Sequence, residues 1–251
     1  MSGESIDGVR IAEIPTASGH RFGHATLDAP ASLNSLTLAM VDRLAAQFDL
    51  WIDDPGIAGI VLDAVGDKAF CAGGDVVALY RSIRSAAPGE VPVEAAAFFE
   101  REYRLGHRIH TCPKPVLCWG HGIVMGGGIG LLAGASHRVA TPGTRLAMPE
   151  ITIGLYPDVG GSWFLGRAPG RTGLFLALTG APMNAADARF AGLADFVVAH
   201  DDKAKVLETL SASRWQGSRK EDDANLGALL DAHACPMPAS PTRSWWQRPR
   251  P

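Results

Sequence analysis

The chain has 251 residues, of which 47% are hydrophobic and 20% are charged, and its formal net charge is -3 at pH 7. This length is sufficient for a substantial hydrophobic core. The slightly acidic balance excludes nucleic acid as the main partner, because that partner requires a basic protein surface. No apolar run reaches the length of a membrane span and the N-terminal residues lack a secretion signal, so we expect no membrane partner.

The cysteines and histidines show neither a disulfide framework nor a metal-binding pattern. The four cysteines stand alone in the sequence, without a CxxC pairing: Cys71, Cys112, Cys118 and Cys235. Isolated thiols are typical of a reducing compartment, and we therefore expect a cytoplasmic protein. His107 and His110 share one face of a predicted helix, but nothing nearby completes a ligand set, so we expect no metal site.

Strand and helix patterns alternate along the chain, which predicts an α/β fold with helices packed on sheets. The expected strands span residues 9–14, 22–27, 59–65, 116–122, 137–141 and 145–150. Apolar residues at three- and four-residue steps predict helices over residues 41–52, 76–85, 93–110 and 127–135. Thr37 is a candidate cap of the first helix, and Asp54-Pro55-Gly56 predicts its end.

The character of the chain changes near residue 212, where it becomes polar and then rich in Pro, Arg and Trp. We expect a short helix near residues 223–232, followed by a poorly ordered end. Residues 1–200 are accordingly expected to form the main domain, and residues 201–251 a short helical segment with a disordered tail.

Two glycine-rich stretches stand at predicted strand-to-helix junctions. One begins at His121 and has six glycines in its first 14 positions, of which Gly126 to Gly128 directly precede a helix. The other is AFCAGGD, at residues 69–75. Glycine weakens ordinary secondary structure, so these runs indicate that another group must approach the backbone closely.

Two kinds of ligand site fit the longer stretch. Residues 128–133 match G-x-G-x-x-G/A and Glu150 follows about 20 residues later, a pattern of dinucleotide-binding turns. Alternatively, backbone N–H groups at the start of a helix can hold a developing negative charge, as in an oxyanion hole. Such a hole usually takes its second donor from another loop, which residues 69–75 would supply. The two stretches together therefore favour carbonyl chemistry.

Longer motifs carry a family resemblance. Asn34-Ser35-Leu36 precedes the first helix, and four stretches follow in order: KAFCAGGD (68–75), KPVLCWGHGIVMGGGIGLL (114–132), MPEITIGLYPDVGGSWFL (148–165) and TGAPMNAADARFAGLADFVV (179–198). In order and spacing, the chain resembles the enoyl-CoA hydratase/isomerase (crotonase) superfamily over residues 8–200. The resemblance implies an acyl-CoA thioester as substrate and a fold built as a spiral of repeated β-β-α units.

The resemblance also implies roles for particular residues. By position in the motifs, the N–H groups of Gly74 and Gly127 would form the oxyanion hole for the thioester oxygen. Ala72, Gly73 and Asp75 would contact the substrate. Relatives usually continue with further helices that close over the acyl pocket or pack between subunits, so we expect a shortened C-terminal helical region here.

The acidic residues discriminate between reactions within the superfamily. Hydratases of this superfamily position water with two glutamates, of which the first would fall at Gly130 and the second matches Glu150. One acid is therefore absent, which disfavours simple hydration. Glu102, Gly127, Glu150 and Asp158 together resemble the 3-hydroxyisobutyryl-CoA hydrolase branch, which acts in valine breakdown.

A thioester hydrolase needs an acid near the carbonyl carbon, either as nucleophile or as base for water, and we assign this catalytic role to Glu150. Asp158 would be the second catalytic residue and would orient the substrate hydroxyl or the attacking water, while Glu102 would line the acyl pocket. Apolar neighbours are expected to form a wall that raises the pKa of Glu150. These neighbours are Met148, Ile151, Ile153 and Leu155.

The sequence thus predicts hydrolysis of a short-chain acyl-CoA thioester, 3-hydroxyisobutyryl-CoA, by a homo-oligomer that needs no cofactor besides the coenzyme A of its substrate. An enoyl-CoA isomerase or hydratase is one alternative, and a non-catalytic acyl-CoA-binding protein is another. Cys71 lies beside the expected oxyanion hole without an evident base. His121 is expected to be a core histidine that bonds a backbone carbonyl.

Overall fold

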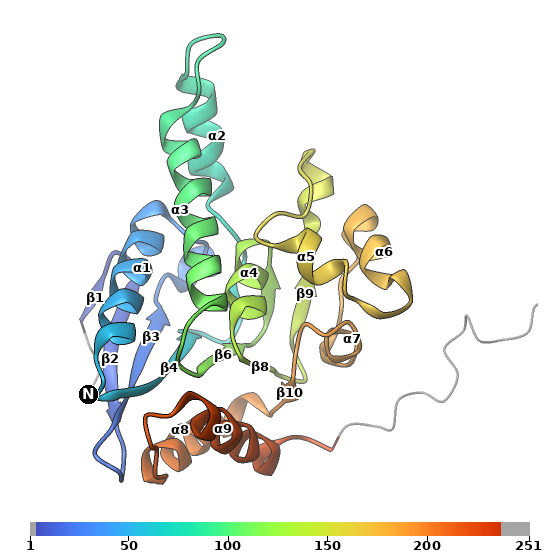
Figure 1. Cartoon of the computed structure of the whole chain (residues 1–251). Helices are drawn as coiled ribbons and strands as arrows, with labels where there is room; N and C mark the ends of the chain where they lie inside the picture. The colour runs from blue at the N-terminus through green and yellow to red at the C-terminus, as the bar shows by residue number, and fades with distance from the viewer. Residues whose placement is uncertain (1–3, 237–251) are drawn as a thin grey trace, which may run out of the picture.

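The computed structural model describes residues 4–236 of the chain. Ten strands form two sheets within this part (Figure 1). The expected disordered tail falls largely on residues 237–251, which lie outside the described residues.

The larger sheet has seven strands and mixes two pairing modes. Its spatial order is β1 (Ser5–Ile6), β2 (Val9–Pro15), β3 (Arg21–Leu27), β4 (Ile57–Ala64), β6 (Val116–Gly120), β8 (His137–Ala140) and β10 (Phe196–Val197). The first three strands pair antiparallel, and each pair from β3 onward is parallel. The smaller sheet contains three parallel strands, in the order β5 (Ala69–Cys71), β7 (Ile123–Met125) and β9 (Arg145–Ala147).

The two sheets arise from a repeated unit. In the pairs β4–β5, β6–β7 and β8–β9, the first strand joins the larger sheet and the second joins the smaller one. A helical segment follows each pair, so the chain winds as a spiral of β-β-α units. This arrangement confirms the fold class expected from the motifs. It also rules out the dinucleotide interpretation, which requires a βαβ unit at the glycine loop, because β7 and β8 lie in different sheets.

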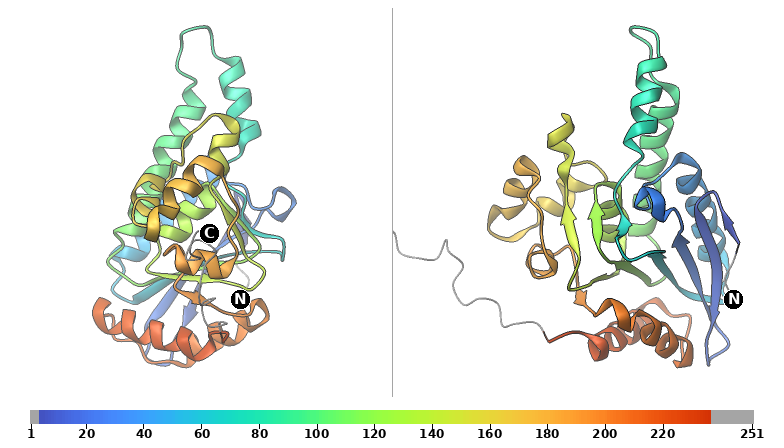
Figure 2. Two further views of the ribbon diagram at one scale, coloured as in Figure 1. Left: turned by 90° about the vertical axis from the view of Figure 1, so that its right-hand side faces the viewer. Right: turned by 180° about the vertical axis from the view of Figure 1, so that it is seen from behind.

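The helices occupy both faces of the larger sheet. They are α1 (Leu38–Asp53), α2 (Val76–Ser85), α3 (Val93–His110), α4 (Gly127–Gly134), α5 (Gly161–Leu165), α6 (Thr172–Thr179), α7 (Ala185–Phe190), α8 (Lys203–Ala212) and α9 (Arg219–His233). Four short 3-10 helices join them: η1 (Pro30–Ser32), η2 (Pro149–Ile153), η3 (Pro169–Arg171) and η4 (His200–Asp202). Helices α2 and α3 form a hairpin that extends beyond the sheets, whereas α8 and α9 lie at the opposite end (Figures 1 and 2).

Strand β4 shows how one sheet supports two cores. All eight of its residues are buried, as in a strand covered on both faces. Ile60 and Leu62 belong to the core shared with α1, α3 and α4, whereas Val61, between them, belongs to the core shared with α8 and α9. Successive strand residues point to opposite faces, so this largely apolar strand serves both helical layers.

Local signals position the helices near the site. Thr37 accepts a hydrogen bond from the Met40 N–H and caps α1, which ends at Asp54 as expected. Helices α2 and α3 begin and end at the residues that the apolar spacing predicts. An ion pair between the partly exposed Lys203 Nζ and the buried Asp63 Oδ2, at 2.9 Å, joins the start of α8 to the end of β4. Helices α8 and α9 thus share a core with the larger sheet.

Two glycine substitutions test how closely the backbone elements approach one another. A Cβ atom at Gly128 would overlap the Cys71 carbonyl oxygen, whereas a Cβ at Gly106, inside α3, would meet nothing within 4 Å. We expect Gly128→Ala to lower the free energy of unfolding by about 2 kcal/mol and Gly106→Ala to raise it by about 0.5–1 kcal/mol through helix propensity. Denaturant-induced unfolding measures both changes, and equal effects at the two positions would contradict the close contact.

Candidate active site

The two glycine-rich loops meet in the structure. They leave the ends of β5 and β7, which are neighbours in the smaller sheet. Gly73 has a φ of +101°, and a Cβ atom there would lie 3.3 Å from the Met125 carbonyl oxygen and 3.7 Å from the Gly127 nitrogen. This positive φ and close contact favour glycine at position 73. The predicted residues of the two loops are therefore brought together.

Both predicted amide donors are free of backbone acceptors. The Leu36 N–H donates to the Gly73 carbonyl, and the Asp75 N–H donates to the Leu36 carbonyl. Within residues 4–236, no backbone carbonyl accepts the N–H of Gly74, which lies between these two bonds. Gly127 is the first residue of α4, where an N–H has no partner within the helix. These two amides can therefore donate to a ligand.

Carboxyl groups occupy the space around the second loop. A Cβ atom at Gly127 would overlap Glu102 Oε1, and a Cβ at Gly126 would lie 3.0 Å from Glu150 Oε1. Any side chain at these positions would displace the two acids. The close approach that the glycine run predicts is thus made by the protein's own carboxyl groups.

Three acids from separate elements gather here. Glu102 comes from α3, Glu150 from η2, and Asp158 from the turn that precedes α5, and their exposed fractions are 5%, 6% and 8%. Within the described part of the chain, Glu102 Oε1 and Glu150 Oε2 are buried without a hydrogen-bond partner. Asp158 Oδ2 accepts a hydrogen bond of 2.8 Å from the Tyr103 hydroxyl. Glu102 is thus a buried acid and not a solvated residue on the outer face of its helix.

Burial raises the pKa of all three acids, and repulsion between the carboxyl groups raises those of Glu102 and Glu150 further. Burial, followed by repulsion from Asp158 and Glu150, raises the pKa of Glu102 to about 8. Burial, followed by repulsion from Asp158, raises the pKa of Glu150 to about 7. Burial also raises the pKa of Asp158, which the Tyr103 hydrogen bond opposes. A carboxyl group that titrates near neutral pH is suited to proton exchange.

The expected apolar wall around Glu150 is only partly formed. Met148 is buried, but the side chains of Ile151 and Ile153 are largely exposed, Ile153 to 63%. The 3-10 turn directs these two side chains away from the interior while Glu150 points inward. The raised pKa of Glu150 therefore stems from its own burial and from Asp158, and not from the two isoleucines.

Val159 explains why no acid stands at Gly130. A Cβ atom at Gly130 would lie 2.6 Å from Val159 Cβ, so the valine side chain fills the space that a side chain at position 130 would need. Val159 has a φ of +44°, a conformation that β-branched residues rarely adopt. Val159 follows Asp158 directly. The same strained turn therefore leaves no space for a side chain at position 130 and places the carboxyl group of Asp158 in the site.

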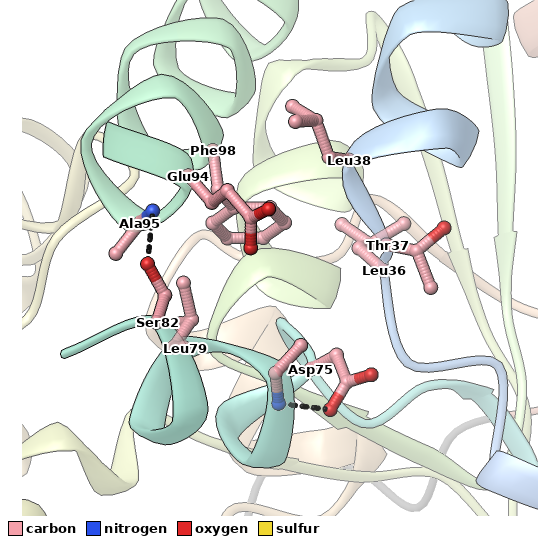
Figure 3. A pocket seen from close by; sticks show the side chains of 10 residues that line it. Leu36, Thr37, Leu38, Asp75, Leu79, Ser82, Glu94, Ala95 and Phe98 are labelled. Carbon is pink, nitrogen blue, oxygen red and sulfur yellow. Dashed lines mark hydrogen bonds between the residues drawn. The ribbon is translucent and has the colours of Figure 1, made fainter. Parts of the chain in front are cut away.

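A cavity with apolar and polar walls lies near Gly74. Its volume is about 290 Å3, and its walls come from the segment before α1 and from α2 and α3 (Figure 3). The central apolar walls are Leu36, Leu79 and Phe98, and a Cβ atom at Gly74 would contact the Phe98 ring at 2.9 Å. Leu36 would also contact a Cβ at Gly127, at 3.2 Å. The cavity thus shares Leu36 with the surroundings of Gly127, although neither glycine nor any of the three acids is among the residues that line it.

Other predicted residues have structural partners. The Asp75 carboxylate caps α2 by accepting the N–H groups of Val77 and Ala78, and it also borders the cavity. The His121 ring bonds the Gly66 carbonyl oxygen at 2.6 Å, which confirms it as a core histidine. Burial raises the pKa of Cys71 to about 12, so its thiol remains protonated and is a poor nucleophile. All four cysteines are free.

A comparison with known families identifies the chain. The profile of the family described as enoyl-CoA hydratase/isomerase matches residues 22–248. The chain belongs to this family. The match continues past residue 200, where the motifs recognised in the sequence end, and so includes α8 and α9.

Curated relatives carry a more specific name. The chain is 42% identical over 212 residues to the mitochondrial 3-hydroxyisobutyryl-CoA hydrolase of Xenopus laevis, an alignment that covers 84% of this chain and 52% of the relative. It is 43% identical over 190 residues to the mitochondrial 3-hydroxyisobutyryl-CoA hydrolase of Homo sapiens, covering 76% and 48% respectively. The chain therefore spans about half the length of the curated relatives that it matches.

Solved structures agree on the fold and carry different names. A carnitinyl-CoA dehydratase from Mycobacterium thermoresistibile is 40% identical, with a TM-score of 0.81 over 94% of this chain and 63% of that one. An enoyl-CoA hydratase from Rhodobacter sphaeroides is 37% identical, with a TM-score of 0.73 over 92% of this chain and 71% of that one. These likenesses confirm the crotonase-type architecture.

The described residues contain neither a membrane-spanning helix nor a metal-binding group of side chains. Between residues 4 and 236, no helix is both long and apolar enough to cross a membrane. Over the same residues, no three His, Cys, Asp or Glu side chains are grouped so that they could hold a metal ion.

Two residues of the site were missed by the sequence reasoning. Tyr103 follows Glu102 directly, and its hydroxyl reaches Asp158, which lies 55 positions away in the sequence. Val159 follows Asp158, and its contact with Gly130 joins two distant segments. The only signal in the sequence was adjacency to a predicted acid, which does not say what a side chain contacts.

The buried acid Glu102 should make stability fall as pH rises. Its pKa is about 8 in the folded chain against 4.5 in the unfolded chain, so the folded state binds more protons between these values. We expect Glu102→Gln to match wild type near pH 4.5 and to be more stable by a few kcal/mol at pH 8, since each pH unit between the two pKa values is worth about 1.4 kcal/mol. Denaturant unfolding across this pH range measures the difference.

Glu100→Gln is the matched control for this measurement. Glu100 lies on the same helix with a side chain that is 61% exposed, beside Arg104. Its substitution should leave the pH dependence of stability as in wild type. A wild-type-like slope for Glu102→Gln would show that Glu102 is not the acid responsible.

Proposed function

We propose that the chain hydrolyses a short-chain acyl-CoA thioester, with 3-hydroxyisobutyryl-CoA as the substrate. The observation that carries this proposal is the buried carboxyl group of Glu150, which titrates near neutral pH beside two free backbone amides. The names of the curated relatives support the choice of substrate. Coenzyme A enters as part of this substrate, and the reaction needs no separate cofactor.

The substrate would bind with its thioester between the two loops. In this proposal the carbonyl oxygen accepts hydrogen bonds from the Gly74 and Gly127 amides. The acyl group enters the cavity beside Leu36, which contacts the region of both amides. Two such donors stabilise the oxyanion by several kcal/mol, because each one typically contributes about 3 kcal/mol.

The proposed reaction uses Glu150 as a general base. Its carboxylate removes a proton from a water molecule while the water oxygen attacks the carbonyl carbon and the carbonyl electron pair moves onto the oxygen held by the amides. The tetrahedral intermediate then collapses and the C–S bond breaks. The departing thiolate takes the proton from Glu150. The products are the carboxylic acid and coenzyme A, and Glu150 is again a carboxylate.

The other two acids would act on the same substrate. Asp158, which keeps one oxygen engaged with Tyr103, has its second oxygen to orient the substrate hydroxyl or the attacking water. Glu102 has an unpartnered oxygen next to Gly127 and can hydrogen-bond to the acyl group. A substrate with a hydroxyl on its acyl chain suits this polar edge better than a plain alkyl chain, because buried polar groups require partners.

An enoyl-CoA hydratase or isomerase is the second candidate. It is favoured by the names of the solved structures at 40% and 37% identity. Gly130 and its contact with Val159 oppose hydration, because the first of the two water-positioning acids is absent and a side chain at its position would have no space. An acyl-CoA-binding protein without turnover is the remaining alternative.

We further propose that the protein is a homo-oligomer in the cytoplasm. Large apolar side chains on α5 and α6, among them Trp163, Leu174, Phe175 and Leu178, are at least half exposed. Self-association would remove such surface from water. The four free thiols suit a reducing compartment.

Release of coenzyme A tests the proposed reaction. With 3-hydroxyisobutyryl-CoA, we expect thiol release by wild type and a loss of 100- to 10,000-fold in kcat for Glu150→Gln, the usual contribution of a general base. Glu100→Gln, an exposed change of the same chemistry, should retain full activity. Trapping the released thiol with a chromogenic disulfide measures the rate.

The same assay separates the alternatives. A change in the ultraviolet absorbance of crotonyl-CoA without thiol release would indicate a hydratase or isomerase instead. Calorimetric binding of the thioester without any turnover would indicate a binding protein. Equal thiol release by wild type and Glu150→Gln would remove Glu150 from the mechanism.

The assignment of the cavity to the acyl group predicts a change in chain-length preference. Leu79→Ala should enlarge the cavity and raise kcat/KM for hexanoyl-CoA relative to 3-hydroxyisobutyryl-CoA about tenfold, because one methylene in an apolar pocket changes discrimination by roughly 10-fold or more. Ile83→Ala, an exposed position on the same helix, is the control and should leave the ratio unchanged. An unchanged ratio for Leu79→Ala would place the acyl group elsewhere.

A further inference from the structure

Helix α3 delivers two consecutive residues to the carboxyl cluster. Glu102 reaches the glycine loop, and the Tyr103 hydroxyl donates a 2.8 Å hydrogen bond to Asp158 Oδ2. Successive helix residues point about 100° apart, so one helix contacts the cluster from two directions. The phenol is the only side-chain donor to any of the three acids within residues 4–236.

Among the residues that the structure describes, acids and no cation act on the charges of the cluster. The groups that act on Glu102 are Asp158 and Glu150, and Asp158 also acts on Glu150. Tyr103 is in turn affected by Asp158, Tyr156 and Glu102. Burial with neighbours of the same charge sign means that the three carboxyl groups cannot all ionise together at neutral pH. The local hydrogen bonds must therefore determine which carboxyl group carries the negative charge.

The hydroxyl of Tyr103 distinguishes Asp158 from the other two acids, because it donates a hydrogen bond to Asp158. Burial and the neighbouring Asp158 carboxyl raise the pKa of Tyr103, so the phenol keeps its proton and remains a donor. A donor stabilises a carboxylate more than it stabilises a neutral carboxylic acid. Glu102 Oε1 and Glu150 Oε2 have no such donor among the described residues.

We propose that Tyr103 is a positioning residue that holds the negative charge of the three-acid cluster on Asp158 and leaves the proton of the resting site on Glu102. The charge on Asp158 in turn delays ionisation of Glu150 until near neutral pH, where this acid can both accept and return a proton. The kinetic consequence of this assignment rests on the proposed hydrolase function, whereas the position of the charge does not.

Titration of the carboxyl carbons by 13C NMR tests the assignment without any need for turnover. In Tyr103→Phe, which keeps the ring and removes the hydroxyl, Asp158 should titrate about one pH unit higher than in wild type, because a hydrogen bond to a charged group is lost. Tyr156→Phe is the matched control, since Tyr156 is 65% exposed and makes no hydrogen bond to Asp158. It should leave the titration of Asp158 as in wild type.

A second variant tests the charge itself. Asp158→Asn removes the repulsion that Asp158 exerts on Glu102 and Glu150, so both should titrate at lower pH than in wild type. In this background, Tyr103→Phe should change neither titration further. Unmoved titrations of Glu102 and Glu150 in Asp158→Asn would overturn the proposal even if Tyr103→Phe failed to fold.

The pH dependence of thioester hydrolysis provides the kinetic readout. If the reactive form has Asp158 and Glu150 both ionised, loss of the hydroxyl moves the ionisation of Asp158 up toward that of Glu150, and the acidic limb of kcat/KM should steepen toward a two-proton dependence on pH. A purely structural role of Tyr103 would scale kcat/KM by the same factor at every pH and leave the steepness of the limb unchanged, which would overturn the proposal. If wild type did not hydrolyse the thioester, the proposed function would be wrong. The proposal for Tyr103 would be unaffected, because the NMR titration tests it independently.

Discussion

The contact between the two glycine loops is the constraint on which the rest of the site depends. Strands β5 and β7 are neighbours, and the chain leaves both at the same edge of the smaller sheet. The loops then lie backbone against backbone, with Gly73 and Gly128 at the points where no side chain fits. This contact fixes the first turn of α4 and therefore the position of the Gly127 amide relative to that of Gly74. The acids lie close to the same turn.

Three acids buried together lower the stability of the folded chain, and they are not expected in a core whose role is only structural. They come from α3, η2 and the turn before α5, so the fold brings together carboxyl groups from segments far apart in the chain. Two of their oxygens have no partner within residues 4–236. Strongly perturbed acids in a partner-free position are typical of functional sites. The arrangement lowers the stability of the folded chain. It also provides carboxyl groups that can exchange protons with a ligand.

The accuracy of the sequence-based predictions follows the range of the interactions involved. The ends of α2 and α3 and the Thr37 cap depend on neighbours a few residues away, and they are predicted correctly. The three-residue strand β7 was missed because its pattern is too short to separate from the glycine run. The outward direction of Ile151 and Ile153, and the Tyr103–Asp158 bond, depend on packing between distant segments. The family motifs indicate that the three acids belong to one site. Which residues surround these acids depends on contacts between segments far apart in the sequence.

The pairing of Gly130 with Val159 has a consequence for how such a site can change over evolutionary time. A glutamate cannot simply be gained at position 130, since its first carbon would enter the space held by the valine. A lineage moving toward a two-acid site would have to change residue 159 beforehand, and glycine there would also relieve the left-handed backbone. Steric overlap thus sets the order of the two mutations. The valine at position 159 prevents any side chain at position 130 until it is itself replaced.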